Sequence, residues 1–184
     1  MGLDMYLEKH TYVKNWDYMG DDQRHKITVK RAGKPRAGIR PDRISKIVEE
    51  VAYWRKANAI HTWFVKNVQD GKDDCGTYYV SAEKLLALKT ACDKVLAASK
   101  LRKGKVKNGY VAKRGGPFEP VIEDGEVIAD PQIAETVLPT ASGFFFGSVD
   151  YDEHYRRDIE DTSAMIGKLM AEEGDSDFYY HSSW

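Results

Sequence analysis

The chain has 184 residues, of which 42% are apolar and 11% aromatic, a composition too rich for a disordered protein and sufficient for one compact core. No apolar run reaches the roughly 18 residues of a membrane span, and the N-terminus MGLDMYLEKH lacks the pattern of a secretory signal. The two cysteines, Cys75 and Cys92, form no C-x-x-C pair, so neither a disulfide framework nor a zinc knuckle is indicated. We therefore expect a cytoplasmic protein with no membrane partner.

Charge is unevenly distributed beneath a formal total of −1. Residues 1–114 hold 25 Lys and Arg against 13 Asp and Glu, a net charge of +12, whereas residues 115–184 hold 3 against 16, a net charge of −13. Such asymmetry indicates an anionic partner or neutralisation within the fold. We expect much of it to be neutralised internally.

The N-terminal third predicts two strands and one long helix. Residues 3–13 alternate apolar and polar side chains, the period of a half-buried strand, and residues 25–31 repeat this pattern. The run AGKPRAGIRP reads as a loop. From Arg43 to about Gln69 apolar residues recur at helical spacing, which predicts a single helix ending at Asp70-Gly71.

The middle of the chain predicts a second helix and a basic elaboration. Ser81 is the expected N-cap of a helix that runs to about Lys100. Residues 100–116 are rich in Lys and Arg and predict an exposed loop. Asp124-Gly125 is a two-residue turn signal for a hairpin within 118–129, and residues 131–137 could form one or two helical turns.

The last third predicts a third long helix over 150–173 and a terminal strand with Phe178, Tyr180, Ser182 and Trp184 on one face. The expected fold is α+β, with about three long helices packed on a mainly antiparallel sheet. We expect a single domain over 1–184, with a loop and hairpin elaboration at about 100–130.

The sharpest candidate site lies on the predicted helix over 43–69. If that segment is helical, Asn58 and His61 lie beside Trp54 on its apolar face, with the cation Arg55 next to them. A buried amide or imidazole without a partner costs on the order of 1–3 kcal/mol, so each needs a hydrogen bond to protein, water or ligand. Two interpretations stay open, a structural network and a ligand pocket.

Asp158 lies on the apolar side of the third predicted helix. A carboxylate facing the core needs a partner, which His61 or Arg55 could supply. A His61–Asp158 pair is a weak catalytic candidate for general acid–base chemistry. The same pair is also a common way to satisfy a core histidine, and no motif places a Ser or Cys nucleophile beside it.

The loop from Pro139 to Ser148 contains Ser142 and Gly143 and leads into the third helix, a junction where backbone N–H groups can hold a phosphate. We include Ser142 among the ligand-binding candidates, although no P-loop pattern is present and Ser148 reads more simply as an N-cap. The five histidines are scattered and no metal-binding motif occurs. We expect neither a metal nor a cofactor.

Several strings of the sequence are distinctive. MGLDMYL, EVAYWRKANAIHTWFVKNVQ, DDCGTYYVS, LPTASGFFFGSVDYDE and the terminal FYYHSSW resemble a group of uncharacterised proteins encoded by bacteriophages and prophages. The resemblance covers about half of the chain and implies a small accessory protein that acts in the bacterial host cytoplasm. It implies no activity and no site residues.

The leading hypothesis is a non-enzymatic protein that sequesters a small anionic ligand, such as a nucleotide or a nucleotide-derived immune signal. Aromatic rings would stack on the base, Asn58 and His61 would read its polar edge, and Arg55 would hold phosphate. The alternatives are a nucleotide- or nucleic-acid-processing enzyme using His61 and Asp158, and a protein–protein inhibitor of a host factor. We do not expect a nucleic-acid polymer as partner, and homo-oligomer formation is left open.

Overall fold

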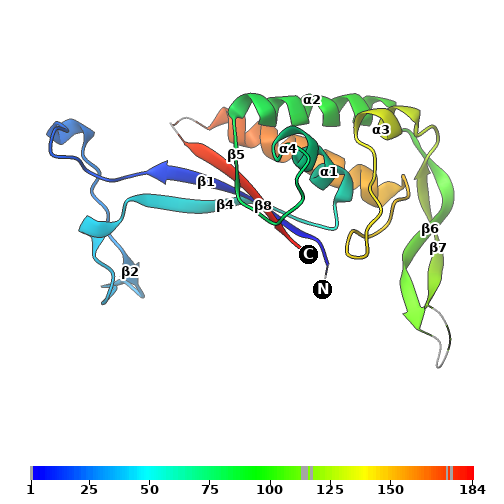
Figure 1. Ribbon diagram of the computed structural model, residues 1–184, viewed down its shortest axis with the longest axis horizontal. Coiled ribbons are helices and arrows are strands. Elements are labelled where there is room, and N and C mark those ends of the chain that lie inside the picture. Colours follow the sequence, from blue (N-terminus) through cyan, green and yellow to red (C-terminus); the bar gives the residue numbers. More distant parts are fainter. Residues whose placement is uncertain (1, 113–115, 117, 173, 175) are drawn as a thin grey trace.

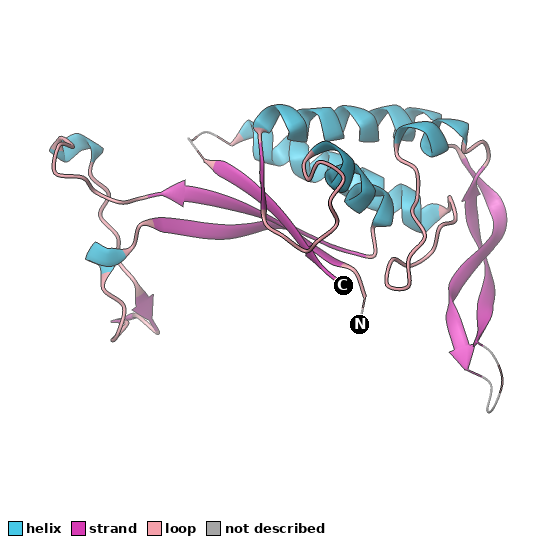
Figure 2. Ribbon diagram, in the orientation of Figure 1, coloured by secondary structure: helices cyan, strands magenta, loops and turns pink. Residues whose placement is uncertain are grey.

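The computed structural model describes residues 2–112, 116, 118–172, 174 and 176–184. Within these residues an antiparallel four-stranded sheet has the strand order β4-β1-β8-β5 (Figure 1). Helices pack on one face of this sheet (Figure 2). The strands are β1 (Asp4–Tyr12), β4 (Lys46–Arg55), β5 (Tyr78–Val80) and β8 (Asp177–Ser183), and the helices are α1 (Asn58–Asn67), α2 (Ala82–Ala98), α3 (Gln132–Val137) and α4 (Glu153–Ala171).

Two extensions project from this body (Figure 1). One is the hairpin of β6 (Leu101–Ala112) and β7 (Phe118–Ile128). The other, which we call the basic arm, is the excursion of residues 14–45 between β1 and β4. It contains the short strands β2 (Lys30–Arg31) and β3 (Lys34–Pro35) and two 3-10 turns, η1 (Asp21–Gln23) and η2 (Pro41–Arg43).

The hydrophobic core lies between the sheet and the helices. The alternation predicted for the first strand is confirmed, because Leu3, Met5 and Leu7 are fully buried and the residues between them face the other side. Side chains from three helices complete the core: Ile60 and Phe64 from α1, Leu85, Leu88, Cys92 and Val95 from α2, and Ile159 and Ile166 from α4.

The α+β fold class is confirmed, as are the second and third helices, the short helix α3 and the C-terminal strand. Ser81 caps α2 as predicted, accepting a hydrogen bond from the Lys84 amide at 3.2 Å. The cap of α4 is Asp152 instead of Ser148, and its carboxylate accepts from two amides in the first turn. No helix in the described part of the chain is long and apolar enough to cross a membrane.

The long helix predicted over 43–69 is wrong. Residues 46–55 form strand β4, paired antiparallel with β1, and only residues 58–67 form helix α1. The chain changes direction at Lys56, whose φ of +61° no helix adopts. The β-branched and aromatic residues of KIVEEVAYW suit a strand, and pairing with β1 decides the structure.

Three further predictions fail, two of them in the hairpin of β6 and β7 and one in the basic arm. Residues 101–112 of the predicted basic loop form strand β6, while residues 113–115 lie outside the described residues. Asp124-Gly125 is no turn, since both residues pair within β7, Gly125 opposite Gly104. Of the strand predicted over 25–31, only Lys30–Arg31 is extended and paired.

Candidate functional site

Asn58 clamps the loop that leads into α4. It is 3% exposed at the start of α1. Its amide nitrogen donates to the backbone oxygens of Phe146 at 2.9 Å and Ser148 at 2.7 Å, and its oxygen accepts from the Ala141 amide at 3.0 Å. All these partners are protein groups, so the Asn58 side chain is satisfied without a ligand.

His61 belongs to a second internal network. It is 1% exposed, with Nδ1 lying 2.8 Å from the Tyr180 hydroxyl. Its Nε2 lies 3.1 Å from a carboxylate oxygen of Asp73. This distance is short enough for an ion pair, but the two groups do not have the geometry of a hydrogen bond. Asp73 also accepts from the Trp184 indole at 3.1 Å. The predicted pairing of His61 with Asp158 is therefore wrong, and the acidic neighbour of His61 is Asp73.

Trp54 and Arg55 point to opposite faces of β4. Trp54 is buried, and its indole donates to Thr162 of α4 at 2.8 Å. Arg55 is exposed, with Nε 3.9 Å from Asp4. The structure therefore places these two neighbours on different sides of the sheet, because side chains alternate along a strand.

Among the described residues, no hydrogen bond or ion pair joins the side chain of Ser142 or Asp158 to that of Asn58 or His61. Ser142 is exposed in the loop before α4. Asp158 is half-buried in α4, and burial raises the pKa of its carboxyl to about 6. Within the described residues no hydrogen bond or ion pair reaches that carboxyl, although Thr162 donates to the Asp158 backbone oxygen at 2.6 Å.

Two surface pockets contain none of the predicted site residues. One, of about 310 Å³, lies at the base of the basic arm and is lined by residues including Asn15, His25 and Lys26. The other, of about 200 Å³, lies between α1 and α3. A nucleotide bound to Asn58 and His61 would have to displace the core side chains around them. The geometry therefore gives the small-ligand prediction no open cavity at those two residues.

The basic arm concentrates, in one exposed segment, cations that the fold leaves unneutralised. Every residue from 31 to 43 is exposed. Within the arm, Arg24 is near Asp21 at 3.8 Å, and Arg40 pairs with Asp42 at 3.0 Å. Lys14 lies over the ring of Trp16. The other six Lys and Arg side chains of the arm have no acidic partner among the described residues. These six are Lys26, Lys30, Arg31, Lys34, Arg36 and Arg43.

The open face of the sheet, opposite the helices, is rich in aromatic rings. Tyr6 stacks on His181 at 4.7 Å between ring centroids and contacts Tyr53 at 5.3 Å. Tyr179 stacks on His10 at 4.3 Å and meets Tyr79 at 5.8 Å. We call this surface the tyrosine face: Tyr6, His10, Tyr53, Tyr79, Tyr179 and His181.

Carboxylates lie among these rings. Asp4 accepts a hydrogen bond from the Tyr53 hydroxyl, and Glu8 lies 2.9 Å from His10 and 3.6 Å from His181. The hydrogen bond with His10, followed by the charge of His181, holds the pKa of Glu8 below its ordinary value, so Glu8 stays ionised. The tyrosine face is thus polar and acidic in its middle.

Sequence reasoning missed the basic arm as a structural unit and missed the tyrosine face. The signal for part of the face was present, because Asp4, Tyr6 and Glu8 occupy the outward positions of the predicted first strand. Tyr53 could not be found, since the segment that contains it was assigned to a helix. The other rings of the face belong to β1, β5 and β8, and β8 follows β4 by more than a hundred residues.

No protein-family model, curated protein or solved structure was found to match the chain. The surfaces of the molecule are therefore what points to its function.

Proposed function

We propose that this protein binds the phosphate backbone of nucleic acid through its basic arm. The observation that carries the proposal is the set of six cations that have no acidic partner among the described residues, on a segment whose residues 31–43 are all exposed. Ordinary solvated surfaces intersperse both signs of charge. Residues 26–46 instead hold eight Lys and Arg against Asp42 alone.

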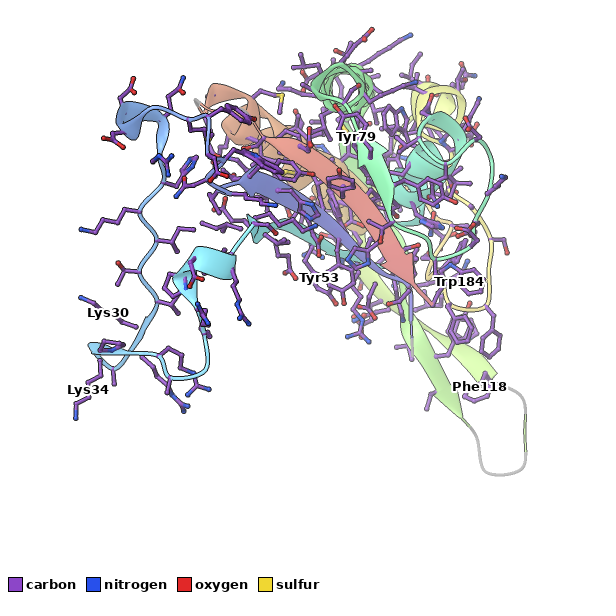
Figure 3. The ribbon with its side chains drawn as sticks, turned by 60° about the vertical axis from the view of Figure 1, so that its left-hand side comes forward. Lys30, Lys34, Tyr53, Tyr79, Phe118 and Trp184 are labelled. Atoms are coloured by element: carbon purple, nitrogen blue, oxygen red, sulfur yellow. The ribbon has the colours of Figure 1, made fainter. Side chains whose placement is uncertain are left out.

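The tip of the arm concentrates this charge. Ala32 and Gly33 form its turn with φ of +49° and +77°, and the pairing of β2 with β3 sets Arg31 directly opposite Lys34. Like charges directly opposite each other destabilise a strand pair. A phosphate bound between them would relieve that repulsion. Figure 3 shows Lys30 and Lys34 projecting from the tip.

Aromatic residues near the base of the arm add a second kind of contact. Trp16 and Tyr18 stack with ring centroids 6.4 Å apart, and both are exposed. Such rings can stack on unpaired bases. This pattern supports a polymer that spans the arm in preference to one small ligand in a cavity, because the cations follow the arm instead of converging on a pocket.

The expectation against a nucleic-acid polymer was based on the acidic last third of the chain. Among the described residues, Glu172 of that third pairs with Lys9, Asp124 with Lys105 and Asp150 with Lys107. None of these pairs involves the arm. The sequestration of a nucleotide stays an untested prediction, to which the sealed positions of Asn58 and His61 give little support.

The proposal is tested by fluorescence anisotropy with a labelled duplex DNA and a single strand of the same length, titrated over a range of salt concentrations. If all six cations contact phosphates, the logarithm of the binding constant for duplex falls with log salt at a slope of about −5. The triple variant Lys30→Gln, Arg31→Gln, Lys34→Gln should bring that slope to about −3.

The matched control removes three exposed lysines elsewhere, Lys84→Gln, Lys94→Gln and Lys100→Gln, and should leave the slope unchanged. No binding to either oligonucleotide at low salt would contradict the proposal, as would equal losses in the two triple variants. Binding to phosphatidylserine vesicles as tight as to DNA would assign the arm to a lipid surface and contradict the assignment to nucleic acid.

A further inference from the structure

The tip of the arm and the tyrosine face are both turned away from the helices. In Figure 1, α2 and α4 lie above the sheet and the tip of the arm hangs below it. Figure 3 shows Tyr53 and Tyr79 on the sheet surface with the arm projecting beside it. Tyr53 is 48% and Tyr79 55% exposed, so about half of each residue is open to solvent.

The chemistry of the tyrosine face suits a cationic segment of protein. By strand register, Glu50 lies opposite Glu8 and Asp177 opposite His10, so four carboxylates, with Asp4, share this face. Cations lie at its edges, where Arg55 is beside Asp4 and Lys46 is 3.3 Å from the His10 ring. Carboxylates would repel phosphates, whereas tyrosine rings and carboxylates together attract Lys and Arg.

This chain itself supplies a segment of the complementary composition. The arm has seven Lys and Arg between Lys26 and Arg43 with a single acid, Asp42. Residues 31–43 are all exposed, which leaves the segment free to contact another molecule. Because arm tip and face are turned to the same side, two copies that meet by their open sides can each offer an arm to the face of the other.

We infer that two copies of this protein pair by their open sides, with the basic arm of each lying across the tyrosine face of the other. The interface is isologous, since the same two surfaces meet twice. Lysine and arginine side chains of the arm lie over the exposed rings of Tyr53 and Tyr79 and beside Glu50 and Asp177. This inference does not rest on nucleic-acid binding, with which it competes for the cations of the arm.

Sedimentation equilibrium of the full chain, without nucleic acid, tests the inference. The wild-type protein should show a concentration-dependent monomer–dimer equilibrium. The reversal Glu50→Lys with Asp177→Lys should raise the dimer dissociation constant at least about tenfold, because two attractive contacts become repulsive in each half of the interface. Tyr79→Ala should weaken the dimer without any change of charge.

Charge-swap rescue makes the test specific. An arm variant, Lys30→Glu with Lys34→Glu, should also weaken the dimer. Mixing it with the Glu50→Lys, Asp177→Lys protein should restore a heterodimer, because the arm of each variant then meets a face of opposite charge in both halves of the interface. The control reversal, Glu83→Lys with Asp161→Lys on the helical side, should leave the dimer intact.

A wild-type protein that stays monomeric at every concentration would overturn the inference, and so would a dimer unaffected by the Glu50 and Asp177 reversal. Failure here is distinguishable from failure of nucleic-acid binding. The face reversal leaves the arm unchanged, so that variant should still show the steep salt dependence in the anisotropy assay if the proposed function holds.

Discussion

Asn58 is the residue on which the conformation of the loop before α4 depends most directly. Asn58→Ala should lower the free energy of unfolding by about 2–4 kcal/mol, because three hydrogen bonds are lost and their backbone partners are left unpaired near the core. Asn58→Asp should be worse, since a carboxylate would face two carbonyl oxygens. Urea denaturation measures both, and a loss below about 0.5 kcal/mol for Asn58→Ala would contradict the clamp.

Asp158 is a residue whose charge the fold disfavours. Burial raises its pKa to about 6, above the value in the unfolded chain. The contribution of this carboxyl to the free energy of unfolding is therefore fully present below the unfolded pKa, where the group is protonated, and is lost as the pH rises through about 6. Asp158→Asn should therefore stabilise the protein by about 1–2 kcal/mol at pH about 7.5, after allowance for partial exposure, and the gain should vanish near pH about 4.

Thermal unfolding at the two pH values checks this prediction. The exposed Asp17→Asn variant removes the same charge and serves as the control. An Asp158→Asn gain that is equal at both pH values would show that the effect comes from packing and not from the ionisation of the carboxyl.

At the scale of elements, two glycines should respond to alanine in opposite ways. Gly167 lies inside α4, where an added Cβ would meet only the flexible end of Lys89 at 3.3 Å. Gly125 lies in β7, where a Cβ would approach the Val106 methyl at 2.7 Å and Glu153 at 2.6 Å. We expect Gly167→Ala to stabilise by about 0.5–1 kcal/mol and Gly125→Ala to destabilise by about 1–2 kcal/mol.

Differential scanning calorimetry distinguishes the two outcomes by the direction of the shift in Tm. A Gly125→Ala variant as stable as the wild type would mean that the hairpin of β6 and β7 can shift relative to α4 without loss. The close cross-strand approach at Gly104 and Gly125 would then not constrain the hairpin.

At the scale of the whole molecule, stability is concentrated in the body and the arm contributes little burial. At protein concentrations too low for the dimer inferred above, trypsin should cut first between Lys26 and Lys46, since that segment is exposed and rich in Lys and Arg. Lys84 and Lys94 are equally exposed but belong to helix α2 and should be cut later. Mass spectrometry of early digests checks the order, and a first cut in α2 would contradict it.

The structure shows where the opposite charges of residues 1–114 and 115–184 lie. Internal neutralisation was expected, and Lys9, Lys105 and Lys107 do pair with acids of the last third. The arm cations do not, because their segment leaves the body between β1 and β4 while α4 lies on the other side of the sheet (Figure 1). The charge difference between the two parts of the chain is therefore displayed in part at the surface.

The sequence by itself determined the elements whose stability is local. The outward and inward positions of β1, the Ser81 cap of α2, the stripe of α4 and the need of Asn58 and His61 for buried partners all follow from periodicity and from the cost of an unpaired polar group. These features involve neighbours along the chain or a single buried atom, so no knowledge of the fold was needed.

Only the tertiary structure decided what those elements meet. Whether KIVEEVAYW is a helix or a strand depends on its pairing with β1, and whether His61 neighbours Asp158 or Asp73 depends on which loop closes over α1. The same holds for the tyrosine face and for the unpaired cations of the arm. Contacts between residues far apart in sequence are set by packing of the whole chain, and local periodicity carries no information about them.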